Sequence, residues 1–356
     1  MKKLHLLRPI LLAAVCLLLF CSAGCFSVDS GESESSARFG GMANAAAAQT
    51  REDAAHSILV AGTGYPCTIT DYLGYEVTLE EKPERIAVLS GTFLNMWYAL
   101  GGKSICRTDL RTAMVDPACE EEIAALPSVG AVYNANVEAV IQLQPDFIIA
   151  QAGVQSSVCK TLRDMGFKII TLHMRSYQDV LDHLRAFGVL LGNSDHVEQV
   201  IAGMEAEKKA ITDRLPAQPK RVVILYVTSS ALSVKLGNSI AGNVADILGL
   251  DNIAAGLPPD TLGSETTPLD IEYIVAQNPD VILVTSMISS NEDAKRVMRE
   301  EFTTNPAWAG IEAIKEGRVV YLPQEYFLYN AAHKYVEAIR YMAKGVYPEI
   351  YGSLDE

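Results

Sequence analysis

The chain has 356 residues and a formal net charge of −14. This length is enough for two domains of typical size. The negative charge argues against nucleic acid or an anionic membrane surface as a partner, because both attract a surplus of Lys and Arg.

The first residues have the layout of a secretory signal peptide. A basic start at Lys2, Lys3 and Arg8 precedes an apolar run over residues 9–20. That run is too short for a transmembrane helix. We predict that residues 1–24 are removed, which takes away three positive charges and changes the formal charge from −14 to −17.

Cys25 follows the small residues Ser22-Ala23-Gly24. The arrangement resembles a bacterial lipobox, in which the cysteine is acylated, although Ser22 stands where Leu is usual. We predict lipidation of Cys25 and a location on the extracytoplasmic face of the cell membrane, since two or more acyl chains anchor a protein stably. The alternative is an ordinary cleaved signal in which Cys25 has no role.

The rest of the chain divides by composition. Residues 25–64 contain few large apolar residues after Cys25, which predicts a flexible linker. From Tyr65 onward the sequence is globular. We predict an N-terminal α/β lobe at 65–192, an interdomain helix at 193–216 and a C-terminal α/β lobe at 217–356.

The cysteines and histidines of the globular part form no metal motif. Cys67, Cys106, Cys119 and Cys159 have no zinc or redox spacing, and the histidines are scattered. Export permits a disulfide, and Cys106 with Cys119 is the only pair close in sequence. We prefer buried free thiols and predict no metal site of the protein's own.

An internal repeat sets the expected architecture. After a predicted hairpin at 68–79, the segment from Glu138 to Asp146 recurs from Glu272 to Asp280, 134 residues later. Each copy predicts a short helix that ends before Pro, followed by an apolar strand of the kind found in parallel sheets. The flanking strands repeat as well, which predicts two Rossmann-like α/β lobes with parallel sheets and right-handed crossovers.

A single long backbone helix is expected to join the lobes. Asn193 and Ser194 are suitable N-cap residues, and apolar residues then recur on one face until Pro216. About 22 residues make a rod of roughly 33 Å. Such a rigid connection predicts lobes that rock only slightly.

These features together resemble the helical-backbone (class III) substrate-binding proteins of ABC importers for ferric siderophores, haem and cobalamin. The resemblance covers residues 70 to about 351. Its markers are both Glu…Pro-Asp repeats and the segments Thr70–Val77, Pro83–Ser90, Ala99–Gly102, Ile240–Gly249 and Trp308 with Ala313–Tyr321.

The resemblance implies a binding protein, not an enzyme, that acts as a monomer and hands a small-molecule metal chelate to permease subunits. It implies no resident cofactor. A ferric siderophore is the leading ligand, with haem, cobalamin and molybdate or tungstate as alternatives. An exported enzyme is the rival from another class, but no nucleophile elbow or metal motif is present. A surface sensor or adhesin without transport is a third possibility.

The family docks one glutamate of each lobe onto arginines of the permease. The matching residues are Glu138 and Glu272, which open the two repeated helices. The alternative is a structural role, because acids are favoured in the first turn of a helix by its dipole. Their common register on two related lobes favours docking.

Ligand-binding residues are expected in the segments that follow the strands, because open α/β sheets bind ligands at the carboxyl edge. Cations can neutralise an anionic chelate, and Tyr offers a flat ring with a hydroxyl. We predict Arg175, Tyr226, Lys235, Tyr326 and Tyr329 as ligand-binding residues. Tyr226 has a core position within its apolar strand as the alternative.

Haem and cobalamin make narrower demands. Haem needs an axial ligand, for which Met96, His173, Met174 and His333 are candidates. The resemblance associates cobalamin with several Trp residues in the cleft. This chain has only two Trp residues, which disfavours cobalamin.

Overall fold

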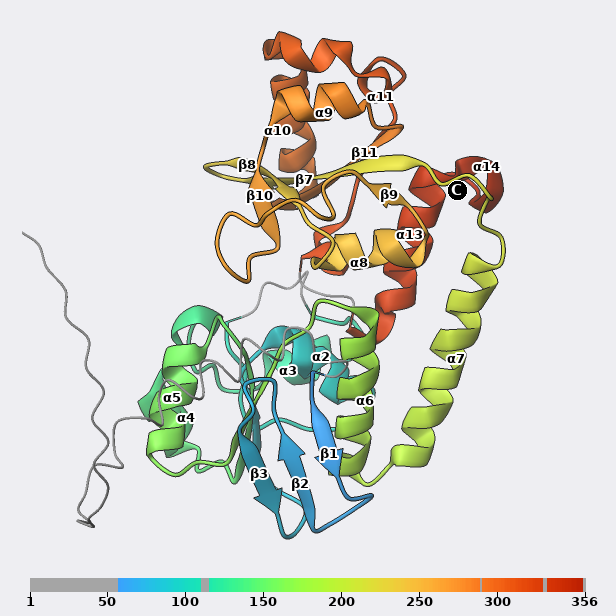
Figure 1. Ribbon diagram of the computed structural model, residues 1–356. Helices are drawn as coiled ribbons and strands as arrows, with labels where there is room; N and C mark the ends of the chain where they lie inside the picture. Colours follow the sequence, from blue (N-terminus) through green and yellow to red (C-terminus); the bar gives the residue numbers. More distant parts are fainter. Residues whose placement is uncertain (1–56, 110–114, 289, 329–331, 355–356) are drawn as a thin grey trace, which may run out of the picture. The chain divides into compact units, whose positions relative to one another are not determined.

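The computed structural model describes residues 57–109, 115–288, 290–328 and 332–354, which form three sheets with surrounding helices (Figure 1). Among these residues no helix is both long enough and apolar enough to cross a membrane. The predicted signal peptide, Cys25 and Tyr329 lie outside the described residues.

The first sheet contains the predicted hairpin. Its three antiparallel strands are β1 (Leu59–Ala61), β2 (Cys67–Thr70) and β3 (Glu76–Leu79). Thr70 pairs with Glu76, and Gly74 in the turn has a φ of 85°, a left-handed conformation that glycine adopts readily. The predicted linker boundary at residue 64 is wrong, because Leu59–Ala61 pairs with β2. A short strand can form on backbone hydrogen bonds despite weakly apolar flanks.

The N-terminal parallel sheet has the order β4-β5-β6. Its strands are β4 (Ile86–Val88), β5 (Phe147–Gln151) and β6 (Ile169–Leu172). The accompanying helices are α2 (Gly91–Ala99), α3 (Glu120–Ala124), α4 (Val137–Gln142), α5 (Ser156–Asp164) and α6 (Tyr177–Leu191), with the 3-10 turn η2 (Val132–Asn134). Helix α6 was not predicted from the sequence; it begins with a capping box formed by Ser176 and Asp179.

The C-terminal sheet has the order β10-β8-β7-β11-β12, with β9 beside β7. Its strands are β7 (Arg221–Thr228), β8 (Leu232–Lys235), β9 (Asp251–Asn252), β10 (Thr266–Pro268), β11 (Val281–Met287) and β12 (Val319–Tyr321). β7, β11 and β12 are parallel, as predicted. β8 and β10 are antiparallel additions. The segment after β7, where ligand-binding residues were expected, is therefore largely the strand β8. The Thr228 N–H donates to the Ala231 carbonyl in a tight turn, which lets the chain reverse and pair with β7.

Helices cover both faces of this sheet (Figure 1). They are α8 (Ile240–Ile247), α9 (Ile271–Gln277), α10 (Asn291–Thr304), α11 (Glu312–Lys315), α12 (Gln324–Phe327), α13 (Tyr335–Val346) and α14 (Pro348–Tyr351), with the 3-10 turns η3 (Pro306–Gly310) and η4 (Ala332–Lys334). In Figure 1, α9 and α10 lie on one face of the sheet, and α8 and α13 lie on the other.

The long helix predicted between the sheets is α7 (Ser194–Thr212), which packs against α6 and α13 (Figure 1). Val197, Ile201 and Met204 form part of its buried face. Asn193 precedes the helix as predicted, but its side chain donates to the Leu100 carbonyl instead of capping the helix.

Apolar side chains of the central strands alternate between two cores. In β7, Val222 and Ile224 contribute to a large core that also contains α7, α8 and α13, whereas Val223 and Leu225 pack with α9, α10 and η3. In β5, Phe147 faces the same large core, and Ile148 faces a separate core that also contains residues of α4 and α5. This period of two follows from strand geometry. One continuous core therefore joins the inner faces of both parallel sheets.

The Pro-Asp part of the repeat has a structural role in both halves. The Asp146 carboxylate accepts hydrogen bonds from the Glu84 and Arg85 N–H groups at 2.7 and 2.9 Å. The Asp280 carboxylate accepts one from the Arg221 N–H at 2.8 Å. Each aspartate thus joins the starts of two neighbouring parallel strands and defines their register.

We predict that Asp146→Ala lowers the free energy of unfolding by about 1–1.5 kcal/mol, because it removes two backbone hydrogen bonds whose exposed donors can then bond to water. Urea denaturation measures the change. Asp164→Ala is the matched control, since Asp164 forms only an exposed pair with Lys160 and a change within about 0.5 kcal/mol is expected. Equal effects of the two substitutions would contradict the register role.

Candidate functional site

Polar side chains gather where the parallel strands end. In the N-terminal sheet, the Gln155 side chain donates to the carbonyls of Leu89 and Val132 at 2.7 and 3.0 Å. In the C-terminal sheet, the Gln324 side chain donates to Ser286 Oγ at 2.9 Å. Segments predicted to follow the strands therefore meet at the carboxyl edge of each sheet.

Lys235 and Tyr226, two of the predicted ligand-binding residues, lie together. The Lys235 ammonium is 4.1 Å from the centroid of the Tyr226 ring, a cation–π distance. Tyr226 is half-buried on β7, and its hydroxyl lies 3.1 Å from Met287 Sδ. The side chain therefore extends away from the apolar core, against the core alternative.

Lys235 is a buried cation whose ion-pair partner among the described residues is Glu265. The side chain is 8% exposed, and Nζ lies 3.4 Å from Glu265 Oε1. Burial lowers the pKa of Lys235 because it disfavours the charged form, while the Glu265 carboxylate acts in the opposite direction. Arg175 also lowers the pKa of Lys235 by charge repulsion. Glu265 was not predicted from the sequence.

Arg175 follows β6 and contacts the loop before β10 of the C-terminal sheet. Its guanidinium donates to the Gly263 carbonyl at 3.0 Å, and its backbone N–H donates to Asp179 Oδ2 at 2.8 Å. Gly263, the partner of Arg175, lies two positions before Glu265, the partner of Lys235, so three predicted residues, Arg175, Tyr226 and Lys235, gather around one loop. We call these three residues with Glu265 the cationic group.

His173 lies next to Arg175 and stacks on Tyr72, with ring centroids 4.6 Å apart. Burial and the Arg175 charge lower the pKa of His173 to about 4, so the imidazole is neutral at pH 7. The buried Asp71 carboxylate positions the stack, since it accepts from the Thr171 N–H at 2.9 Å and pairs with Arg163 at 2.7 Å.

Asn243 on α8 connects the segment after β6 to the C-terminal helices. Its Oδ1 accepts from the Tyr177 N–H at 2.9 Å and from the Tyr335 hydroxyl at 3.0 Å. This link restrains the backbone that carries Arg175. A polar Asn within an apolar helical segment was the available sequence signal, and it was missed.

Tyr326 lies apart from the cationic group. Its ring is 6.4 Å from that of Tyr341 and packs partly against the large core. Burial raises the pKa of Tyr326. No described contact joins Tyr326 to Lys235 or Arg175, so its ligand-binding role stays a prediction.

The candidates for haem and cobalamin are mostly buried. Met96, Trp97 and Trp308 are fully buried, and Met174 is 6% exposed. Met96, one of the predicted axial candidates, is not accessible to a ligand in this structure because its side chain lies in the large core. His333 lies 3.6 Å from Asp116. Within the described residues there is no group of three or more His, Cys, Asp or Glu able to hold a metal.

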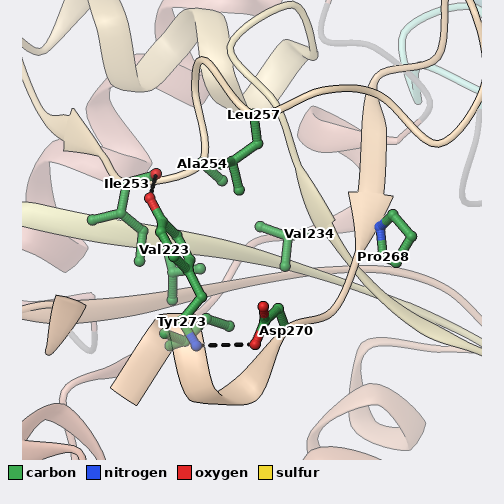
Figure 2. Close-up of a pocket in the computed structure, with 9 residues that line it drawn as sticks. Val223, Val234, Ile253, Ala254, Leu257, Pro268, Asp270 and Tyr273 are labelled. Atoms are coloured by element: carbon green, nitrogen blue, oxygen red, sulfur yellow. Dashed lines mark hydrogen bonds between the residues drawn. The ribbon is translucent and has the colours of Figure 1, made fainter. Parts of the chain in front are cut away.

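Two cavities in the described structure have no residue of the cationic group in their lining. Figure 2 shows an apolar one of about 10 Å³ between the C-terminal sheet and α9, where the Tyr273 hydroxyl donates to the Ile253 carbonyl at 2.7 Å. It has room for about one water molecule. The second, of about 510 Å³, is lined by residues 79–84, Asp146 and Lys168. It lies at the amino ends of the strands, the edge opposite to the usual binding edge.

Glu138 and Glu272 occupy equivalent positions in α4 and α9. Both are exposed, and the structure gives neither a hydrogen bond nor an ion pair within its described residues. The helices are already capped, because Asn136 Oδ1 and Asp270 Oδ1 each accept an N–H at 3.0 Å. The two glutamates are therefore available for contacts with another molecule.

All four cysteines of the described residues are free thiols, as preferred from the sequence. Cys67, Cys106 and Cys159 are buried, and Cys119 is partly exposed. Burial raises the pKa of Cys106 to about 12 and that of Cys159 to about 11, which makes these thiols unreactive at neutral pH.

Comparisons with known proteins agree on one family. The model of the family described as "Periplasmic binding protein" matches residues 86–326. The chain is 23% identical over 296 residues to the "Uncharacterized ABC transporter substrate-binding lipoprotein YvrC" of Bacillus subtilis (strain 168), covering 81% of this chain and 87% of that protein. It is 26% identical over 251 residues to the "Fe(3+)-citrate-binding protein YfmC" of the same organism, covering 68% and 74%.

Among solved structures, an ABC transporter substrate-binding protein from Listeria monocytogenes EGD-e has a TM-score of 0.64 to this chain. The sequence identity is 17%, and the match covers 75% of this chain and 99% of that one. At this identity the likeness shows the fold. The arrangement of two α/β lobes with parallel sheets, predicted from the repeat, is thereby confirmed.

We predict that buried His183 makes the protein less stable as the pH falls from about 6.5 to about 4. The ring is fully buried, with Nε2 3.2 Å from Ser57 Oγ, and burial lowers the pKa of His183 to about 4. In this window the unfolded chain takes up a proton that the folded chain does not, so stability present above pH 6.5 is lost, by up to about 3 kcal/mol.

Urea denaturation at several pH values tests this expectation with His183→Phe, which keeps an apolar ring without a titrating group. The decline between pH 6.5 and 4 should be shallower in this variant than in the wild type. His196→Gln, at an exposed position on α7, should retain the wild-type slope. An unchanged slope in His183→Phe would refute the assignment.

Proposed function

The chain belongs to the periplasmic binding protein family and is a substrate-binding protein of an ABC importer, and we propose that it captures an anionic metal chelate, with a ferric siderophore as the leading class. The observation that carries this proposal is the cationic group. Arg175 and Lys235 supply two positive charges, and the Tyr226 ring supplies a flat apolar face.

The charges favour an anion over a neutral ligand. His173 is neutral at pH 7 and adds no charge. The cationic group contains two cations, Arg175 and Lys235, and one carboxylate, Glu265, while the more distant Asp260 carboxylate also raises the pKa of Lys235. A low local dielectric strengthens their attraction for a carboxylate or hydroxamate oxygen. The similarity to a protein named for ferric citrate supports the same class of ligand.

Haem and cobalamin receive less support. The two Trp residues of the chain are fully buried, so neither offers a surface for a corrin ring. Two of the four axial candidates for haem, Met96 and Met174, are also buried. An oxyanion such as molybdate would bind through the same two cations, Arg175 and Lys235, and a ligand screen distinguishes it from a ferric chelate.

We further propose that lipid on Cys25 holds the protein on the extracytoplasmic face of the membrane and that the protein acts there as a monomer. The name of the YvrC relative includes the word lipoprotein, which supports an anchor. Under this proposal the chain is a binding protein that reaches its permease from the membrane surface. It carries out no reaction on the chelate.

Glu138 and Glu272 are proposed to contact arginines of the permease. Their exposure, the absence of a partner among the residues that the structure describes and their equal positions on two related helices support this role. The helix-dipole alternative explains one acidic residue in a first turn. The dipole alone does not explain why both helices, α4 and α9, have a side-chain N-cap and, in addition, an exposed glutamate without a described partner.

A thermal-shift screen of the soluble domain tests the ligand. Ferric citrate, ferric siderophores, haem, cobalamin and molybdate are each added to the wild type and to Arg175→Gln and Lys235→Met. A ligand at 100 times its Kd stabilises the folded state by about 2.7 kcal/mol. We expect a ferric chelate to stabilise the wild type and each variant to bind it at least about tenfold more weakly. Stabilisation by haem or cobalamin alone would overturn the proposed class.

Docking is tested by the double variant Glu138→Ala with Glu272→Ala. We expect chelate uptake by cells to be abolished while the affinity of the purified protein is unchanged, because the glutamates lie outside the cationic group. The matched control is Glu121→Ala with Glu292→Ala, since both are exposed first-turn glutamates, one on α3 and one on α10. Normal uptake by the first double variant would refute the docking role.

A further inference from the structure

A loop segment before β10 contacts both cations of the cationic group. We define residues 260–265 as the strap. The Gly263 carbonyl accepts from the Arg175 guanidinium at 3.0 Å, and Glu265 Oε1 lies 3.4 Å from Lys235 Nζ. Gly263 and Glu265, which are two positions apart in the strap, thus contact Arg175 and Lys235, the two cations that the proposed ligand requires.

The Lys235–Glu265 pair is unequal in its access to water. The Lys235 side chain is 8% exposed, whereas that of Glu265 is 35% exposed. The carboxylate can therefore rotate into solvent and regain hydration, while the ammonium stays buried. Their 3.4 Å separation also exceeds the 2.7–2.9 Å of a strong charge-assisted hydrogen bond. Glu265 is the partner that another anion can replace.

The strap keeps its shape without the Glu265 side chain. Asp260 Oδ2 accepts from Thr266 Oγ1 at 2.9 Å, and the Asp260 N–H donates to the Thr266 carbonyl at 2.9 Å. The Asn238 side chain donates to the Ser264 carbonyl at 3.2 Å. The Glu265 backbone is fixed as well, because its carbonyl accepts from the Leu236 N–H at 2.9 Å. A substitution of the carboxylate alone therefore leaves the backbone in place.

We infer that Glu265 is an internal competitor for the anion site, whose carboxylate neutralises Lys235 in the ligand-free protein and is displaced by an anionic ligand. This inference rests on the proposed function, since it assigns a role to Glu265 within the same site. A tethered carboxylate competes at an effective concentration in the millimolar range or above. Small inorganic anions are excluded by such a competitor, whereas a chelate with several contacts displaces it.

The test uses sulfate as the probe, titrated at constant ionic strength into the whole soluble domain and followed by calorimetry. Removing the competitor should increase sulfate affinity, so Glu265→Gln is expected to bind sulfate at least about tenfold more tightly than the wild type. The matched control is Glu292→Gln, which removes the same charge from an exposed pair with Lys295 on α10. It should bind sulfate as weakly as the wild type.

Two further variants make the test specific to this pair. Glu265→Gln combined with Lys235→Met should lose the gain, because the cation that receives sulfate is absent. Glu265→Asp keeps the charge but shortens the side chain, and an intermediate affinity is expected. Sulfate affinity of Glu265→Gln equal to that of the wild type, or a gain that survives Lys235→Met, would overturn the inference.

Ferric citrate as a second probe separates this inference from the proposed function. Tighter binding of ferric citrate by Glu265→Gln, again by about tenfold, supports both. If ferric citrate binds neither to the wild type nor to Glu265→Gln, while Glu265→Gln binds sulfate more tightly, the role of Glu265 as a competitor is supported and the assigned chelate class is wrong. If ferric citrate binds equally to both and sulfate affinity is unchanged, the class stands and the competitor is refuted.

Discussion

Side chains from the inner faces of both parallel sheets pack into one apolar core, and the rest of the structure depends on this packing. Val222 and Ile224 of β7 share it with Phe147 of β5, and helices α6, α7, α8 and α13 complete it. Close packing resists small displacements. It therefore explains, better than the single connecting helix does, why the segment after β6 has a defined position beside α8 and the strap.

The site that results depends on a buried charge. A lysine that is almost fully buried costs free energy unless an opposite charge accompanies it. Lys235 has Glu265 for this purpose, and its ammonium also lies 4.1 Å from the centroid of the Tyr226 ring. In the proposed binding mode, an anionic ligand replaces Glu265 as the partner of Lys235. Under this proposal the affinity for the ligand is a difference between the free energies of two ion pairs, which is compatible with both capture and release.

The internal repeat combines two kinds of residue with different roles. Asp146 and Asp280 accept backbone hydrogen bonds that join neighbouring strands, so their recurrence has a structural cause. Glu138 and Glu272 recur in the same segments without any described partner. The recurrence of a residue in both copies of the repeat therefore does not show whether its role is structural or functional. The contacts of each residue do.

Local patterns in the sequence were enough to determine the two α/β halves, the hairpin, the connecting helix and the equivalence of Glu138 with Glu272. Apolar periodicity, proline and turn residues act over a few positions, so a single chain reveals them. The grouping of Arg175, Tyr226 and Lys235 was within reach because parallel strands end at a common edge. Glu265 was not, because strand pairing brings it to a partner distant in sequence. The polar Asn243 stood out within its apolar helical segment, but its partners Tyr177 and Tyr335 depend on helix packing. Only the tertiary structure decided which charge faces Lys235, since an ion pair depends on distance in space and leaves no local pattern.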